Sequence, residues 1–204
     1  MKNQVSNART SFGPLFLQIV KENHKKVLKL DARLRKFEMQ PAKRSGEDQV
    51  FVAERKIQLL EIELAKASTV VIVFSAMILE SYIYDYAARH LTDAFVQEHL
   101  DRLDPLSKWI KVPKLITGKE LPNHQNWRQL LRRLIKTRNS VIHHKSSQPP
   151  TKFNDIKKYF ETLQADSVSL LAVAKQSTQL LEILAGKIIE IDPEETPWVK
   201  SYLA

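Results

Sequence analysis

The sequence predicts an all-α fold, a bundle of four to six helices. Glycine is scarce, with 4 in 204 residues, and the 9 prolines fall largely between long segments in which apolar residues recur at helical spacing. Few glycines and clustered prolines are typical of helices joined by sharp breaks. A hydrophobic fraction of 43% with 27% charged residues is that of a globular chain long enough to bury a core.

The first half of the chain predicts two long helices. Pro14 suits a first helical turn, and the periodic pattern Leu15–Met39 predicts the helix that follows. After a polar connector, apolar residues return every three or four positions across Val50–Leu91. A joint near Ser68 would divide this segment, and the β-branched run Thr69–Val73 would also suit a buried strand. Helix is favoured because the pattern extends beyond any strand length.

The second half predicts shorter helices and a long final one. In chain order we expect helices at Asp93–Leu103 and Asp104–Leu115, a connector at Pro113–Pro122, helices at Asn123–Lys145 and Asn154–Ile191, and an irregular tail at Asp192–Ala204. Asp104 is expected to cap its helix ahead of a first-turn proline, and Gly186 is a candidate break in the last helix. The expected organisation is an N-terminal helical extension (1–49), a helical bundle (50–191) and a C-terminal tail (192–204).

Composition and missing motifs exclude several classes of protein. The chain has no cysteine, which rules out a disulfide scaffold, a thiolate metal site and cysteine catalysis. Met1–Val20 lacks the apolar core of a secretory signal, and the longest uncharged run, Ala67–Leu79, is shorter than the roughly 18 residues that a membrane-spanning helix needs. A cytoplasmic protein without a membrane partner is therefore expected. Phosphate-loop, nucleophile-elbow and zinc-helix motifs are missing, and we expect neither a metal nor a cofactor.

The positive charge is concentrated in one segment. The formal net charge of +9 arises from 32 Lys and Arg against 23 Asp and Glu. Residues Arg102–Lys145 hold eleven of the basic side chains and only two acidic ones, so the remaining chain is balanced. This concentration favours a polyanionic partner, with a solvated basic surface as the alternative.

Seven residues of the helix expected at Asn123–Lys145 form one apolar face when placed at about 100° per residue. They are Trp127, Leu130, Leu131, Leu134, Ile135, Val141 and Ile142. Arg138 falls near the centre of this face. Because a guanidinium cannot lose its charge, Arg138 needs a buried acceptor or an anionic ligand.

The opposite flank of that helix is polar and basic. It carries Arg128, Arg132, Lys136, Asn139 and His143. Asn139 and His143 lie four residues apart and are neighbours on the helix surface. His144 points about 100° away from His143, so the two imidazoles are poorly placed to bind one metal ion. The alternatives are that Arg138 extends along the helix to reach solvent and that His143 is an ordinary surface residue.

Glu80 is the expected partner of Arg138. It is the first charged residue after Lys66, on a segment that is apolar nearly all round. A charge-assisted pair between Glu80 and Arg138 would satisfy both groups, whereas a Glu80 at the bundle edge would need no partner. Further polar atoms near Glu80 are expected from Tyr82, Tyr84, Asp85 and Tyr86.

The segment from Arg138 to His143 resembles the R-x(4–6)-H motif of the HEPN superfamily (higher eukaryotes and prokaryotes nucleotide-binding domain). The stretch Phe74–Asp85 is similar to the central helix of that family, which often carries an acid at the position of Glu80. The segments Leu106–Pro113 and Trp127–Lys145 follow in the family's order. The resemblance covers roughly residues 67–145.

This resemblance implies a helical bundle that forms a homodimer, with two motif helices meeting in one shared cleft. Active members are metal-independent endoribonucleases, many of them toxins or antiviral defence proteins, and a neutralising antitoxin or defence-system protein is an expected partner. Other members are catalytically inactive RNA-binding, nucleotide-binding or assembly modules. A structural adaptor that binds an acidic protein is the remaining alternative.

The resemblance also assigns roles to residues. Arg138, Asn139 and His143 would be catalytic, and Glu80 would support Arg138. The RNA backbone would be bound by Arg128, Arg132, Lys136 and Lys145. The chemistry would be attack of a ribose 2′-OH on the adjacent phosphate, which requires single-stranded or loop RNA that can reach an in-line geometry.

Overall fold

A computed structural model describes residues 12–38, 47–143 and 153–203. Within these ranges every regular element is helical and no strand occurs, which confirms the all-α prediction. The α-helices are α1 (Gly13–Glu38), α2 (Glu47–Leu91), α3 (Asp93–Phe95), α4 (Pro105–Thr117), α5 (Trp127–Ile142), α6 (Phe153–Ile191) and α7 (Thr196–Tyr202). Short helical turns, η1 (Val96–Leu100), η2 (His124–Asn126) and η3 (Pro193–Glu195), lie between them. These seven α-helices are one more than the largest number expected.

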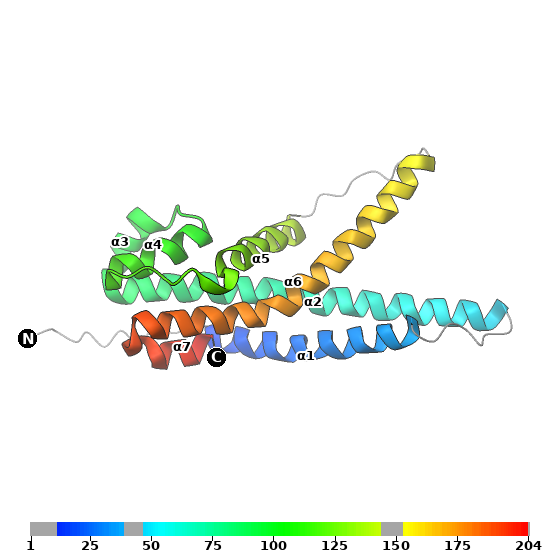
Figure 1. Cartoon of the computed structure of the whole chain (residues 1–204), viewed down its shortest axis with the longest axis horizontal. Coiled ribbons are helices and arrows are strands. Elements are labelled where there is room, and N and C mark those ends of the chain that lie inside the picture. Colours follow the sequence, from blue (N-terminus) through cyan, green and yellow to red (C-terminus); the bar gives the residue numbers. More distant parts are fainter. Residues whose placement is uncertain (1–11, 39–46, 144–152, 204) are drawn as a thin grey trace, which may run out of the picture.

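Helix α2 is the central element of the bundle. It packs against α1, α4, α5 and α6 (Figure 1). Its middle turns are apolar all round, so Val71, Ile72 and Leu79 are fully buried. The helix is continuous through Ser68 and Thr69–Val73, which confirms helix over strand and decides for one long helix over two helices joined near Ser68. In Figure 1, α6 crosses the bundle and its N-terminal part extends away from the other helices.

One segment of α2 meets the length and hydropathy criteria for a membrane span. The segment is Phe51–Leu91, with a mean hydropathy of 1.9 in its most apolar window. Half of that window is buried inside the bundle. A helix at the centre of a protein core passes the same test, because burial in protein and burial in lipid both select apolar residues.

Helix α4 extends further than its sequence suggests. The predicted cap is confirmed, since the Ser107 N–H donates to the Asp104 carboxylate at 3.1 Å. The connector expected from Pro113 is wrong, because the helix continues to Thr117 with Pro113 buried inside it. A proline there costs one backbone hydrogen bond, which the packing of its neighbours offsets. The helix ends instead at Gly118, whose φ of 73° is the left-handed conformation that glycine adopts without strain.

The irregular tail expected at Asp192–Ala204 is also wrong. Pro193 and Pro197 each occupy the first turn of a helical segment, where proline loses no hydrogen bond. Helix α7 buries Val199 and Tyr202. The same hydrophobic core includes Leu17, Val20, Val27, Leu30 and Leu34 of α1. Helix α6 runs without a break past Gly186, so that candidate break is wrong as well.

Candidate active site

Three buried side chains fix the position and rotation of α5. Trp127 is fully buried at its start and donates its indole N–H to the Pro122 carbonyl at 3.0 Å. Leu131 and Leu134 follow at helical spacing and are buried as predicted. With this face against the core, the opposite flank of α5 is turned outward.

The predicted ion pair between Arg138 and Glu80 is formed. A terminal nitrogen of the guanidinium donates to the carboxylate of Glu80 on the neighbouring α2. The Arg138 side chain is 20% exposed and that of Glu80 is 36% exposed, so the pair lies at the edge of the core. The Nε of Arg138 is buried without a partner among the described groups. The pair thus ties the motif helix to the central helix and holds a cation just beneath the surface.

Asn139 and His143 lie on the exposed side of the last turn of α5. The helix ends at Ile142, three residues earlier than expected, and the His143 N–H donates to the Asn139 carbonyl at 2.9 Å. Both side chains are exposed. Lys145, assigned to RNA binding, lies outside the described residues. The imidazole of His143 is therefore available to a ligand at the surface, one turn beyond Asn139.

A cavity of about 340 Å³ lies beside the motif. It is bounded on the α4 side by Asp104, Pro105 and Leu106, and on α5 by Arg132, Ile135, Lys136 and Asn139. The four α5 residues repeat at a spacing of three or four, so they line one face of that helix. Its lining combines apolar side chains with two cations and one carboxylate, and the apolar and cationic groups could contact the base and the phosphate of an unpaired nucleotide. Sequence reasoning assigned Asp104 only a capping role and did not include the α4 residues in a site.

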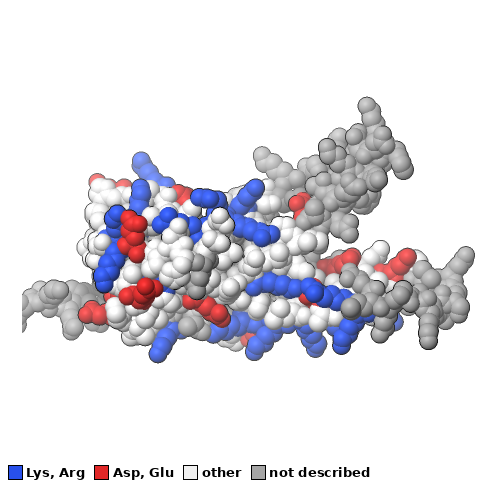
Figure 2. Space-filling view, in the orientation of Figure 1, with Lys and Arg blue, Asp and Glu red and all other residues white. Residues whose placement is uncertain are grey.

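The basic flank of α5 faces outward only in part. Figure 2 shows Lys and Arg side chains gathered over the region of α5. Arg132 and Lys136 are exposed, and no ion pair ties them to an acid in the described part of the chain. Arg128 is half-buried and lies over the Trp127 ring at 5.5 Å, so it is held against the protein. Arg132 and Lys136 are the better placed of the three to contact a polyanion.

A second row of basic side chains follows α1 along the lower edge of the molecule in Figure 2. The sequence of α1 contains seven Lys and Arg against three Asp and Glu. The net charge of the residues outside Arg102–Lys145 is zero, because acidic residues in other helices cancel the positive charge of α1. Adding up the charges along the sequence therefore did not reveal this row.

The apolar face of α5 is not buried along its whole length. Ile142, expected in the core, is 51% exposed, and Met77 on α2 is 39% exposed. Leu134 is the last buried residue of α5, about two turns before the helix ends. The prediction for Ile142 is therefore wrong for the single chain. The motif is accompanied by an uncovered apolar side chain.

Tyr82, Tyr86 and Asp85, three of the polar residues expected near Glu80, have their partners elsewhere. Tyr82 and Tyr86 donate to Glu195 and Asp192 at 3.2 and 2.9 Å, and Asp85 accepts from the Tyr202 hydroxyl. Two residues along a helix correspond to a rotation of about 200°, so Tyr82 points away from Glu80 towards the C-terminal segment.

This second polar cluster brings together three possible metal ligands. The ligand atoms of His90, Asp192 and Glu195 all lie within 4.8 Å of one another. Glu195 is already bonded by Arg89 at 2.5 Å and by His90 at 3.1 Å. Burial disfavours the charged form of Glu195, but these donors outweigh it and hold the carboxyl pKa below its usual value. The Arg89 guanidinium already supplies the positive charge that a metal ion would bring. The contacts of this cluster join η3 and α7 to the end of α2.

Comparisons with known proteins identify no relative of this chain. No protein-family model, curated protein or solved structure matches the chain. Any functional assignment therefore depends on the chemistry of the side chains that the fold brings together.

Proposed function

We propose that this chain is a HEPN-like, metal-independent endoribonuclease that acts as a homodimer. The observation that carries the proposal is the Arg138–Glu80 ion pair, which holds the R-x4-H helix against the central helix. Asn139 and His143 lie exposed at the end of that helix, and Asn139 lines a cavity together with Arg132 and Lys136. A half-buried cation and an amide on one turn, with an imidazole on the next, are groups that can serve phosphate cleavage.

The proposed reaction is a transesterification within RNA. The ribose 2′-oxygen loses its proton to a base and attacks the adjacent phosphorus. The bond to the 5′-oxygen breaks, and an acid protonates that oxygen. The products are a 2′,3′-cyclic phosphate and a 5′-hydroxyl. Imidazole titrates near neutrality and suits both proton roles, and a second copy of the chain supplies a second His143 for the other role.

The remaining residues bind and orient the substrate. Arg138 stabilises the negative charge that develops on the phosphate oxygens, and Glu80 fixes its position. Asn139 hydrogen-bonds the phosphate or orients His143. Arg132 and Lys136 contact neighbouring phosphates, which gives affinity that depends on salt and not on base sequence. Cleavage of cellular or viral RNA would suit a toxin or antiviral defence protein, with a neutralising partner protein to control it.

The test compares two histidine variants on total RNA and on a short single-stranded oligonucleotide. We expect His143→Ala to lose cleavage by at least about 100-fold, the usual contribution of a general acid or base. The control is His99→Ala, which removes an exposed imidazole on η1 and should cut RNA at the wild-type rate. EDTA should leave cleavage unchanged.

Each outcome distinguishes one alternative. Equal cleavage by His143→Ala and wild type would remove His143 from the mechanism. Loss of activity in EDTA would contradict metal independence. Salt-dependent RNA binding without cleavage would favour a catalytically inactive binding module, and no binding would favour an adaptor for an acidic protein.

A further inference from the structure

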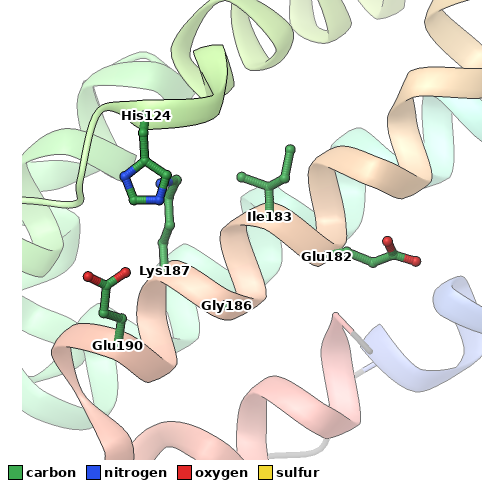
Figure 3. Close-up of a pocket in the computed structure, with 6 residues that line it drawn as sticks. All are labelled: His124, Glu182, Ile183, Gly186, Lys187 and Glu190. Carbon is green, nitrogen blue, oxygen red and sulfur yellow. The ribbon is translucent and has the colours of Figure 1, made fainter.

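A second cavity, of about 410 Å³, lies between α6 and η2. His124 of η2 bounds one side, and α6 contributes Glu182, Ile183, Gly186, Lys187 and Glu190 (Figure 3). We call it the Lys187 cavity. None of its lining residues belongs to the cavity beside the R-x4-H motif, so it is separate from the proposed ribonuclease site.

Lys187 is an unusual residue for the wall of a cavity. Its side chain is only 2% exposed, and its Nζ has no hydrogen-bond partner in the part of the chain that the structure describes. Burial lowers the pKa of Lys187, and the nearby carboxylate of Glu190 opposes that change and favours the charged form. A buried ammonium without an acceptor costs stability, and such a group calls for a functional explanation.

The surrounding side chains define what would satisfy this ammonium. In Figure 3, Lys187 extends towards the imidazole of His124, Glu190 approaches from the same side, and Glu182 points away from both. The ammonium offers three N–H donors and the imidazole one more. At Gly186 an added Cβ would meet nothing within 4 Å, so the cavity has room beside Lys187.

We propose that the Lys187 cavity binds a small oxyanion, a phosphate or carboxylate group, between the ammonium of Lys187 and the imidazole of His124. The oxygen atoms of such a group accept the donors that the protein leaves unpaired. The carboxylate of Glu190 lies on the same side and limits the negative charge that the cavity accepts. This site is independent of RNA cleavage.

The experiment measures thermal unfolding of the full chain during titration with sodium phosphate or sodium acetate, with chloride holding the ionic strength constant. We expect a saturable rise in Tm with at least one probe, because a ligand that binds only the folded state stabilises it. Lys187→Met and Gly186→Leu should each lose the saturable rise, the first by removing the ammonium and the second by filling the cavity. Lys200→Met, on an exposed lysine of α7, is the matched control and should keep it.

Two further results complete the test. Without added anion, Lys187→Met should unfold at the same or a higher temperature than the wild type, because replacing an unpaired buried charge by an apolar chain removes its desolvation cost. Arg132→Ala should keep the phosphate effect, which separates this cavity from the flank of α5. A wild type without a saturable rise for either probe, or an undiminished rise in Lys187→Met, would overturn the proposal. A response to acetate alone or to phosphate alone identifies the oxyanion.

Discussion

Arg138 serves the fold and the proposed chemistry with the same guanidinium. Its contact with Glu80 joins α5 to α2 at the edge of the core, where both side chains keep some exposure. Because both side chains are partly exposed, solvent screens the pair and its coupling should be modest. We expect a double-mutant cycle with Glu80→Gln and Arg138→Met to give a coupling energy of about 1 kcal/mol in urea unfolding.

The same cycle distinguishes positioning from catalysis. Glu80→Gln should reduce RNA cleavage less than Arg138→Met, because Glu80 acts only through Arg138. The conservative Arg138→Lys restores the charge but not the geometry of the guanidinium, and should recover only part of the rate. A coupling energy near zero would show that the contact contributes nothing to stability, and equal rates for Glu80→Gln and Arg138→Met would contradict separate roles.

Glu195 is the buried carboxylate on which the C-terminal segment depends. It is 4% exposed and accepts hydrogen bonds from Tyr82 and Arg89, and the Arg89 guanidinium lies 4.3 Å from the Trp198 ring. Glu195→Gln leaves Arg89 without its counter-ion and should cost ~3 kcal/mol of unfolding free energy at pH 7.

The pH dependence of that loss has a definite sign. The native pKa of Glu195 lies below the usual carboxyl value of 4.5, so its contribution is complete above pH 4.5 and is lost as the pH falls through the native pKa. The difference between wild type and Glu195→Gln should therefore shrink between pH 5 and pH 3 in urea unfolding. A difference that stays constant over this range would show that Glu195 is not the titrating group.

At the scale of elements, the helices that follow an apolar repeat could be predicted from sequence, and their ends could not. Val50–Leu91 was expected as a helix because its pattern outlasts any strand, and α2 begins only three residues earlier. Pro113, expected to open a connector, lies inside α4, and Pro197, in the tail expected to be irregular, lies in the first turn of α7. Tertiary packing decides whether a proline is tolerated, and a local pattern does not contain that information.

The candidate site also combines features that a local pattern predicts with features that depend on tertiary packing. The pairing of Glu80 with Arg138 could be inferred because each is a lone charge on an apolar face. The exposure of Ile142 and the partners of Tyr82 depend on where other helices end and pack, which periodicity within one helix does not report.

Helix α7 depends on a close contact with the start of α1. The ring of Tyr202 lies against Gly13, where an added Cβ would overlap the ring atoms. Gly13→Ala should therefore displace Tyr202 and cost about 1–3 kcal/mol, the usual range for overpacking. Equilibrium unfolding measures this loss, and Gly186→Ala, where the added Cβ has open space, is the matched control. Equal destabilisation by both would contradict a specific contact.

For the whole molecule, the decisive question is whether two chains share one site. A single chain presents one His143, and the proposed reaction transfers one proton to a base and another from an acid. Beside the motif, Ile142 keeps 51% of its surface exposed at the end of α5. In the proposed dimer, a partner helix that covers Ile142 would bring a second His143 to the same cleft and would account for the exposed apolar residue.

This arrangement predicts that assembly and activity are lost together. The wild type should be a dimer by light scattering coupled to gel filtration, and Ile142→Lys should be a folded monomer with cleavage reduced by at least about 100-fold, since a general acid or base is missing. Leu28→Lys places the same charge on an exposed leucine of α1 and should remain dimeric and active. A monomeric wild type that cleaves RNA would place the whole reaction within one chain. A dimeric Ile142→Lys would move the interface elsewhere on the surface.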